Sequence, residues 1–158
     1  MSATYRIQDE PRPGTLGHLV VNPVFPLLAT MMAGVWLGLP WFVFNGFALG
    51  STSRIKELVL ALLVVPGTLL LILLLNTLLA QGALTETSKP YAAVGITVWK
   101  LAMGYVLFNL QQRSFALHEY YGGVVRNGVL VLVASIVLGS SVLFSLTGGN
   151  KILLELLG

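Results

Sequence analysis

The 158-residue sequence contains no cysteine, and charged residues are scarce. Without cysteine, this sequence forms no disulfide, thiolate metal site, cysteine-ligated iron–sulfur cluster or covalently attached c-type haem. Charged residues make up 9% of the chain, whereas a soluble domain usually carries about 25%. Hydrophobic residues make up 56%. This balance predicts an integral membrane protein.

Recognisable catalytic motifs are also missing. The sequence has no His-Glu-x-x-His, no paired aspartates, no Gly-x-Ser-x-Gly and no glycine loop of the phosphate-binding kind. His118 and Glu119 are neighbours, but adjacent helical residues diverge and do not face each other. We therefore favour a non-enzymatic protein without catalytic residues, cofactor or metal, and we keep a membrane enzyme as the third alternative.

The two histidines do not suggest a shared metal or haem site. His18 precedes the first long apolar stretch, whereas His118 follows the third. In a topology with four spans, they would lie on opposite sides of the membrane. The net charge of +3 comes from basic residues scattered singly, without the clustered arginines and aromatics of a nucleic-acid surface. We expect no nucleic-acid partner.

Four long apolar stretches predict an all-α bundle of four transmembrane helices. We expect a polar tail over residues 1–18, a transmembrane domain over 19–147 and a short interfacial tail over 148–158. Within the domain, the expected helices cover about 24–47, 58–79, 91–121 and 124–146.

Two of these helices depart from a plain span. The run from Leu19 to Ser53 is uncharged and too long for one perpendicular span, so we expect a single helix kinked at Pro40. A break that leaves a half-helix after Pro40 is the alternative. Pro66 is a second kink site, in the second helix. The third helix, at about 1.5 Å per residue, is long enough to extend beyond the bilayer.

Lys100 is the most unusual residue, because it lies near the middle of the third predicted span. A charge at that depth costs at least about 2.5 kcal/mol and marks a candidate functional site. Helical spacing places Lys100, Gln111 and His118 on one face, with Gly104 and Leu107 between them. The face is either a polar seam that lines a pore or cavity, or a structural feature in which the lysine snorkels or pairs with a neighbouring helix.

Small residues recur one turn apart in the first and fourth predicted helices, which favours close helix packing in lipid. The packing candidates are Ala29, Ala33, Gly34, Gly38, Gly46 and Gly50 in the first helix, and Ser135 and Gly139 in the fourth. The contacts are either within one chain or between subunits.

The function that these features favour is that of a small non-enzymatic membrane protein acting through helix packing, as a homo-oligomer or as an accessory subunit. The alternative is a small channel or transporter that uses the seam around Lys100. Expected partners are membrane lipids, other copies or other membrane subunits, and the expected location is the plasma or inner membrane.

Basic residues give little information on orientation. Four lie on each side of the expected topology: Arg6, Arg12, Lys89 and Lys151 on one, and Arg54, Lys56, Arg113 and Arg126 on the other. The second set lies in short connections close to the membrane. We therefore expect loops 50–57 and 111–127 to be cytoplasmic.

Overall fold

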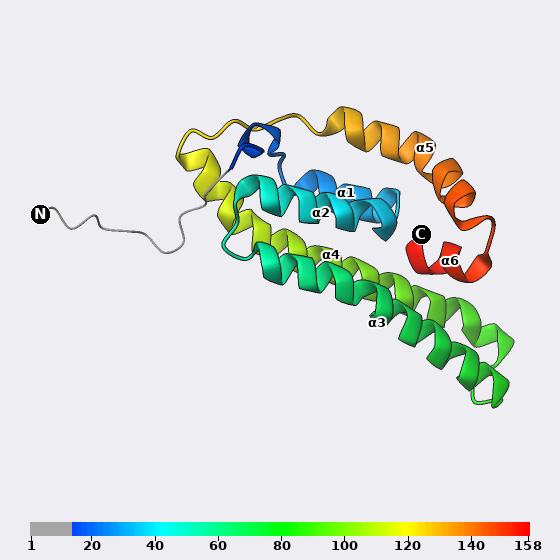
Figure 1. The fold of residues 1–158 in the computed structure, drawn as a ribbon. Coiled ribbons are helices and arrows are strands. Elements are labelled where there is room, and N and C mark those ends of the chain that lie inside the picture. The colour runs from blue at the N-terminus through cyan, green and yellow to red at the C-terminus, as the bar shows by residue number, and fades with distance from the viewer. Residues whose placement is uncertain (1–13) are drawn as a thin grey trace, which may run out of the picture.

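A computed structural model describes residues 14–158, apart from the side chains of Glu86 and Lys151. Most of the expected N-terminal tail, including Arg6 and Arg12, therefore lies outside the described residues. Regular structure in the described part is helical, except for one isolated bridge between Val21 and Arg126 (Figure 1). The α-helices are α1 (Val24–Met32), α2 (Val35–Leu49), α3 (Arg54–Ala80), α4 (Lys89–Tyr120), α5 (Val129–Thr147) and α6 (Lys151–Leu157), with short 3-10 turns at Gly17–Leu19 and Glu86–Ser88.

Three helices, α3, α4 and α5, are long and apolar enough to cross a membrane, and α2 is a shorter apolar helix. At 1.5 Å per residue, α3 is about 40 Å long, α4 about 48 Å and α5 about 28 Å, against a hydrocarbon layer of about 30 Å. The helical composition and these three helices indicate a membrane protein. The ranges of α3 and α4 agree with the second and third predicted helices to within a few residues.

The first predicted helix is wrong: its residues form two helices, α1 and α2, folded back on each other. The backbone N–H of Val21, before α1, donates to the Asn45 side chain near the end of α2, at 2.9 Å. The start of one helix therefore lies beside the end of the other, as in a hairpin (Figure 1). With lengths of about 13 and 22 Å, neither helix reaches across a bilayer by itself.

Glycine explains where this hairpin turns. Gly34 connects the two helices at a φ of 98°, a conformation that residues with a Cβ rarely adopt. One turn into α2, a Cβ on Gly38 would come within 2.6 Å of both the backbone N and the Cα of Thr30. The two helix backbones therefore touch at this point. The alternative of a helix broken at Pro40 is wrong, because α2 continues through Pro40, as α3 continues through Pro66.

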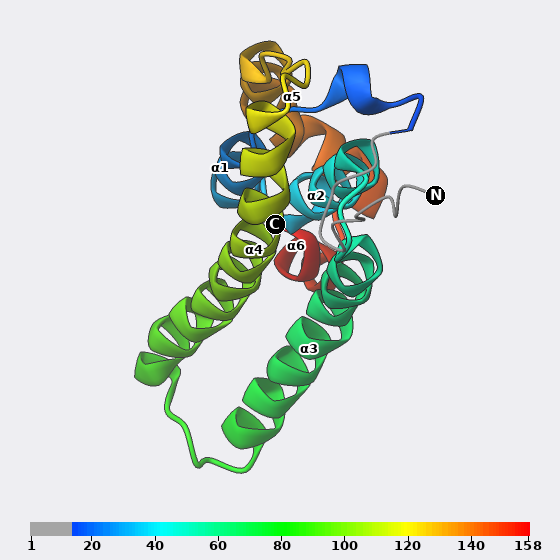
Figure 2. The same cartoon turned by 90° about the vertical axis from the view of Figure 1, so that its left-hand side faces the viewer.

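The α1–α2 hairpin forms a middle layer between α5 on one side and the α3–α4 pair on the other (Figures 1 and 2). The main core joins Leu39 and Phe42 of α2 to Val64 of α3 and Leu107 of α4. A narrow stripe on α5, namely Ser135, Gly139, Leu143 and Thr147, is its only buried face.

Residues 14–23, which we call the N-terminal segment, lie at the same end of the molecule as the connection between α4 and α5. Arg126 donates its backbone N–H to the carbonyl of Val20 at 2.7 Å and its Nε to the carbonyl of His18 at 3.2 Å. His118 lies at this end as well, with its Nε2 3.3 Å from the carbonyl of Val124. The expectation that the two histidines lie at opposite ends is therefore wrong, because the hairpin returns the chain to the end where it started.

Because Arg126 pairs with Val20, the last long helix begins later in the sequence than expected. Residues 124–128 were expected to be helical, but they run beside the N-terminal segment, and α5 begins at Val129. The expected C-terminal tail also has a definite structure. Asn150 caps α6 by accepting hydrogen bonds from the N–H groups of Ile152 and Leu153, and α6 packs between α3 and α4 (Figure 2). Leu156 contacts Ile72 and Ile96, which lie along the length of α3 and α4 rather than at their ends.

Candidate functional site

A buried polar cluster joins α2, α3 and α4 at the end of the molecule where the N-terminal segment lies. The cluster surrounds the carboxylate of Glu57, which has no solvent exposure. We call it the Glu57 cluster; its members are Asn45, Ser51, Ser53, Glu57, Gln111 and Ser114.

Glu57 accepts hydrogen bonds at both carboxylate oxygens. The hydroxyls of Ser51 and Ser53 donate to Oε1 at 2.8 and 2.7 Å, and Nε2 of Gln111 donates to Oε2 at 2.8 Å. All three donors are neutral side chains. Such bonds are required here, because a buried charged or polar group without partners costs several kcal/mol.

The cluster also holds the α1–α2 hairpin to α4. Gln111 donates to the backbone carbonyl of Phe42, and its Oε1 accepts from Nδ2 of Asn45 at 3.1 Å. Asn45 in turn accepts from the backbone of Val21. One glutamine on α4 therefore contacts both the backbone and a side chain of α2. In lipid, where no hydrophobic effect drives helices together, such hydrogen bonds contribute directly to helix association.

Gly46 provides the space for this arrangement. A Cβ at residue 46 would collide with Oε2 of Glu57 and would lie 3.1 Å from Nε2 of Gln111. Gly46 was predicted as a helix-packing residue, and its neighbours are the side chains of the cluster. The sequence does not single out Glu57, because a charged residue just before an apolar run is an ordinary flank of a membrane span. The serines at 51 and 53, close before a glutamate, were the available signal.

The remaining small-residue positions also meet parts of the same chain. Gly38 contacts Thr30, and Gly34 faces the backbone of Leu157 and Gly158. A Cβ on Gly139 of α5 would lie 3.5 Å from the Cβ of Ala33. Ala29 and Ser135 are buried, and Gly50 adopts a left-handed conformation at the end of α2. These residues therefore have packing partners inside the chain.

Lys100, Gln111 and His118 share the buried face of α4, together with Gly104 and Leu107. Their partners are separate. Lys100 donates to the backbone carbonyl of Glu155, Gln111 belongs to the Glu57 cluster, and His118 lies against the backbone of Gly123 and Val124. Gly104 is closed off by Leu27 and Thr30 of α1. The three polar residues therefore share one face of α4, but each of them has its own separate partner.

Lys100 attaches α6 to α4. Its Nζ bonds to the α6 backbone, and Glu155 also supplies the carboxylate that acts electrostatically on the lysine. The carboxylate comes from α6, outside the long helices, which is why the sequence did not suggest an acidic neighbour for Lys100.

We expect Lys100→Met to loosen α6 selectively. A seven-residue helix is not stable alone, so it depends on its contacts. Because the chain has no cysteine, a single Leu156→Cys variant reports on this site by its rate of maleimide labelling. Loss of a hydrogen bond to a charged group, about 1.5–3 kcal/mol, should accelerate labelling roughly 10- to 100-fold. Labelling of Ile152→Cys, at an exposed position, should change little. If Leu156→Cys is labelled at the same rate with and without the lysine, this role is excluded.

A polar cavity of about 300 Å³ lies beside the Glu57 cluster. It is formed between the α2–α3 connection and the last third of α4, and it is lined by Thr52, Ser53, Asn109, Leu110, Arg113, Ser114 and Leu117. Ser53 and Ser114 belong both to this wall and to the cluster. Thr52, Asn109 and Arg113 are exposed, so the cavity lies at the surface.

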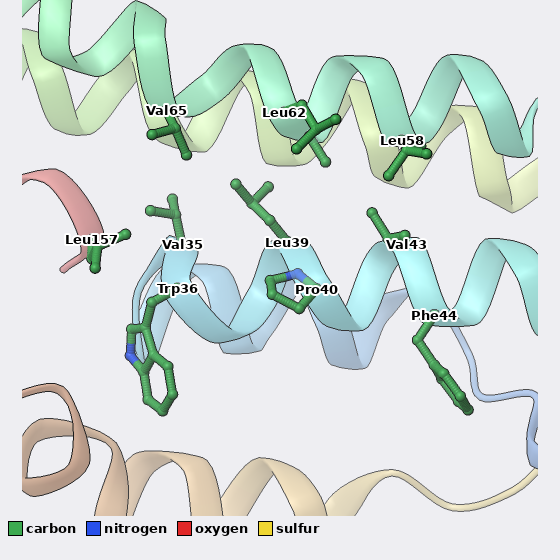
Figure 3. A pocket seen from close by; sticks show the side chains of 11 residues that line it. Val35, Trp36, Leu39, Pro40, Val43, Phe44, Leu58, Leu62, Val65 and Leu157 are labelled. Carbon is green, nitrogen blue, oxygen red and sulfur yellow. The ribbon is translucent and has the colours of Figure 1, made fainter. Parts of the chain in front are cut away.

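A larger, apolar cavity of about 540 Å³ lies between α2 and α3 and reaches Leu157. Figure 3 shows Leu39 of α2 and Leu62 of α3 pointing toward one another across the gap. The one polar side-chain atom among its lining residues, Nε1 of Trp36, donates to the carbonyl of Ala33. This cavity is therefore suited to an apolar ligand, and its lining offers no side chain for catalysis.

Comparisons of the chain with protein-family models, curated proteins and solved structures found no match. Among residues 14–158, no group of three or more acidic or histidine side chains could hold a metal ion. Function therefore has to be inferred from the geometry of this chain.

Proposed function

We propose that the chain is a non-enzymatic, multi-pass membrane protein that works as a homo-oligomer, in which copies associate through the outer ends of α3 and α4. The observation that carries this proposal is the exposure of residues 73–95, which we call the outer hairpin. Apart from Glu86, whose side chain is not described, none of these residues is buried. The outer hairpin projects beyond the other helices (Figures 1 and 2).

Asn76 supports a second copy of this chain as the partner. It lies exposed within a leucine-rich part of α3, flanked by Leu73 to Leu75 and by Leu78 and Leu79. An amide in lipid gains from a hydrogen-bond partner on a neighbouring helix. Because an amide both donates and accepts, Asn76 from two copies related by a two-fold axis satisfies the requirement mutually.

The small-residue faces are not the proposed interface, since they pack within the chain. We therefore propose that assembly uses α3 and α4 instead of the first and last long helices. The polar end of the molecule, with loops 50–57 and 111–127, is proposed to be cytoplasmic. Arg54, Lys56, Arg113 and Arg126 lie there, whereas Lys89 and Lys151 lie toward the opposite end, and an excess of basic residues marks the cytoplasmic side.

The geometry favours this function over a channel that uses Lys100. A transport seam requires a hydrated path along the lysine, but Lys100 is bonded to a backbone carbonyl of α6. Neither of the two cavities described above is lined by Lys100, Gln111 or His118.

The test is the molecular mass of the protein in detergent, measured over a range of protein-to-detergent ratios. We expect a dimer or higher oligomer whose dissociation constant rises about 5- to 30-fold in Asn76→Leu, because an interhelical hydrogen bond of this kind contributes about 1–2 kcal/mol. Asn76→Gln keeps the amide and serves as the matched control. A wild-type protein that stays monomeric at every ratio, or an Asn76→Leu variant that assembles as tightly as the wild type, would overturn the proposal.

A further inference from the structure

The apolar cavity between α2 and α3 borders a backbone carbonyl that lacks its usual helical donor. In an α-helix, the carbonyl of each residue accepts a hydrogen bond from the N–H four residues later. For the carbonyl of Trp36 this residue is Pro40, which has no N–H. Trp36 and Pro40 both line the cavity and lie about one turn apart, so the carbonyl between them lies on the cavity face of α2. The cavity therefore offers a hydrogen-bond acceptor.

The side chains of the lining do not supply the missing donor. Apart from Trp36 they are hydrocarbon, and Nε1 of Trp36 already donates to the carbonyl of Ala33 at 2.7 Å. Water is a poor substitute, because a buried water needs about two to four polar partners and the rest of the lining is apolar. An acceptor without a donor is costly in an apolar environment, so a ligand that brings a donor gains by meeting it.

The depth of the cavity restricts the donor to a neutral group. Figure 3 shows Val35 of α2 and Val65 of α3 facing each other at the end of the cavity near Trp36. Val65 lies about 10 Å along α3 from Leu58, where the uncharged run of this helix begins. At that depth in a hydrocarbon layer of about 30 Å, a charged headgroup would lose its hydration, whereas a hydroxyl that finds an acceptor costs far less.

The cavity is also open to the bilayer and large enough for an apolar chain. Leu62 and Phe44 line it and are 63% and 43% exposed, so a lipid can enter from the side. Leu157 of α6 borders the end near Trp36 (Figure 3). A volume of about 540 Å³ lies within the range of small-molecule sites, which are mostly apolar with a few polar groups that fix orientation.

We propose that this cavity binds a neutral lipid alcohol from the bilayer, with its apolar chain between α2 and α3 and its hydroxyl donating to the carbonyl of Trp36. A phospholipid acyl chain would fill the same space but would bring no donor to this carbonyl. None of residues 73–95 lines the cavity, so this inference does not depend on the proposed oligomer.

The experiment compares oleyl alcohol with its methyl ether, which has the same chain but no O–H. The full chain is purified from bilayers that contain equal amounts of both, and native mass spectrometry measures how much of each is retained. We expect about fivefold preferential retention of the alcohol, which corresponds to one hydrogen bond between neutral groups. Equal retention, or retention of neither compound, would overturn the proposal.

Pro40→Ala tests the acceptor directly. Alanine restores the N–H at residue 40, so the carbonyl of Trp36 can be satisfied within α2, and alanine does not weaken the helix. The preference for the alcohol should disappear, while the methyl ether should be retained as in the wild type. Pro66→Ala makes the same change in α3 at a residue that does not line the cavity, and it should keep the preference. If the preference survives Pro40→Ala, another group binds the hydroxyl and the proposal fails.

Two tryptophan substitutions test the location of the chain. Leu62→Trp fills the cavity from its rim and should prevent retention of both compounds. Leu63→Trp changes the next residue of α3, which is also exposed but does not line the cavity, and it should leave retention unchanged. If the two substitutions have the same effect, the compounds bind elsewhere on the lipid-facing surface and the proposal is wrong.

Discussion

Replacing Gly38 by alanine should separate α1 from α2 and lower the free energy of unfolding by about 3 kcal/mol or more. The new Cβ would lie 2.6 Å from the backbone N and Cα of Thr30, and backbone atoms cannot move aside as the end of a flexible side chain can. Overpacking of a tight contact usually costs about 1–3 kcal/mol, and this contact joins two backbones. The measurement is reversible unfolding in mixed micelles, followed by circular dichroism.

A second variant and a control distinguish backbone contact from ordinary crowding. Gly38→Ala combined with Thr30→Ala removes the side-chain hydroxyl but leaves the close N and Cα atoms, so we expect only partial recovery. Gly95→Ala is the control, because a Cβ at that position in α4 meets nothing within 4 Å. It should be neutral or slightly stabilising, since alanine is the better helix former. Similar effects at positions 38 and 95 would contradict the hairpin.

Gln111→Leu should destabilise the protein by about 3–5 kcal/mol, because several buried polar groups lose a partner at once and each such loss costs about 1–3 kcal/mol. Leucine leaves Oε2 of Glu57, the carbonyl of Phe42 and the amide of Asn45 without this hydrogen-bond partner. It also removes the hydrogen bonds from α4 to α2. The measurement is the same unfolding titration.

The neighbouring glutamine provides the control for this prediction. Gln112 is exposed on the same turn of α4, so Gln112→Leu should change the free energy of unfolding by less than about 0.5 kcal/mol. If the two substitutions have equal effects, the Glu57 cluster does not hold the hairpin in place. A double-mutant cycle between Asn45→Ala and Gln111→Ala would then measure any coupling that remains between α2 and α4.

The two predicted effects have a common origin in the environment of the chain. In water, the burial of apolar area would hold a short hairpin such as α1–α2 against its neighbours. In lipid this contribution is small, and close packing and hydrogen bonds are what stabilise helix contacts. Gly38 supplies the first and Gln111 the second, so single substitutions at these positions should weaken the whole middle layer.

Composition and uncharged runs by themselves predicted a helical membrane protein, together with the extents of α3 and α4. This information is local. A span of about 20 apolar residues between charged or polar ends has few alternatives, because every backbone group must be hydrogen-bonded within the segment. Helical spacing also predicted which residues of α4 share a face, and Lys100, Gln111 and His118 are all buried on it.

Only the tertiary structure decided that residues 24–49 form a hairpin instead of one helix. The apolar run from Leu19 to Ser53 is consistent with either arrangement. What separates them is the approach of Gly38 to Thr30 and the bonds from Asn45 and Phe42 to Gln111, which lies 66 and 69 residues away in sequence. The Glu57 cluster and the polar cavity depend on the same long-range contacts. Periodicity and composition do not contain these contacts, because they arise only when three separate helices meet at one end of the molecule.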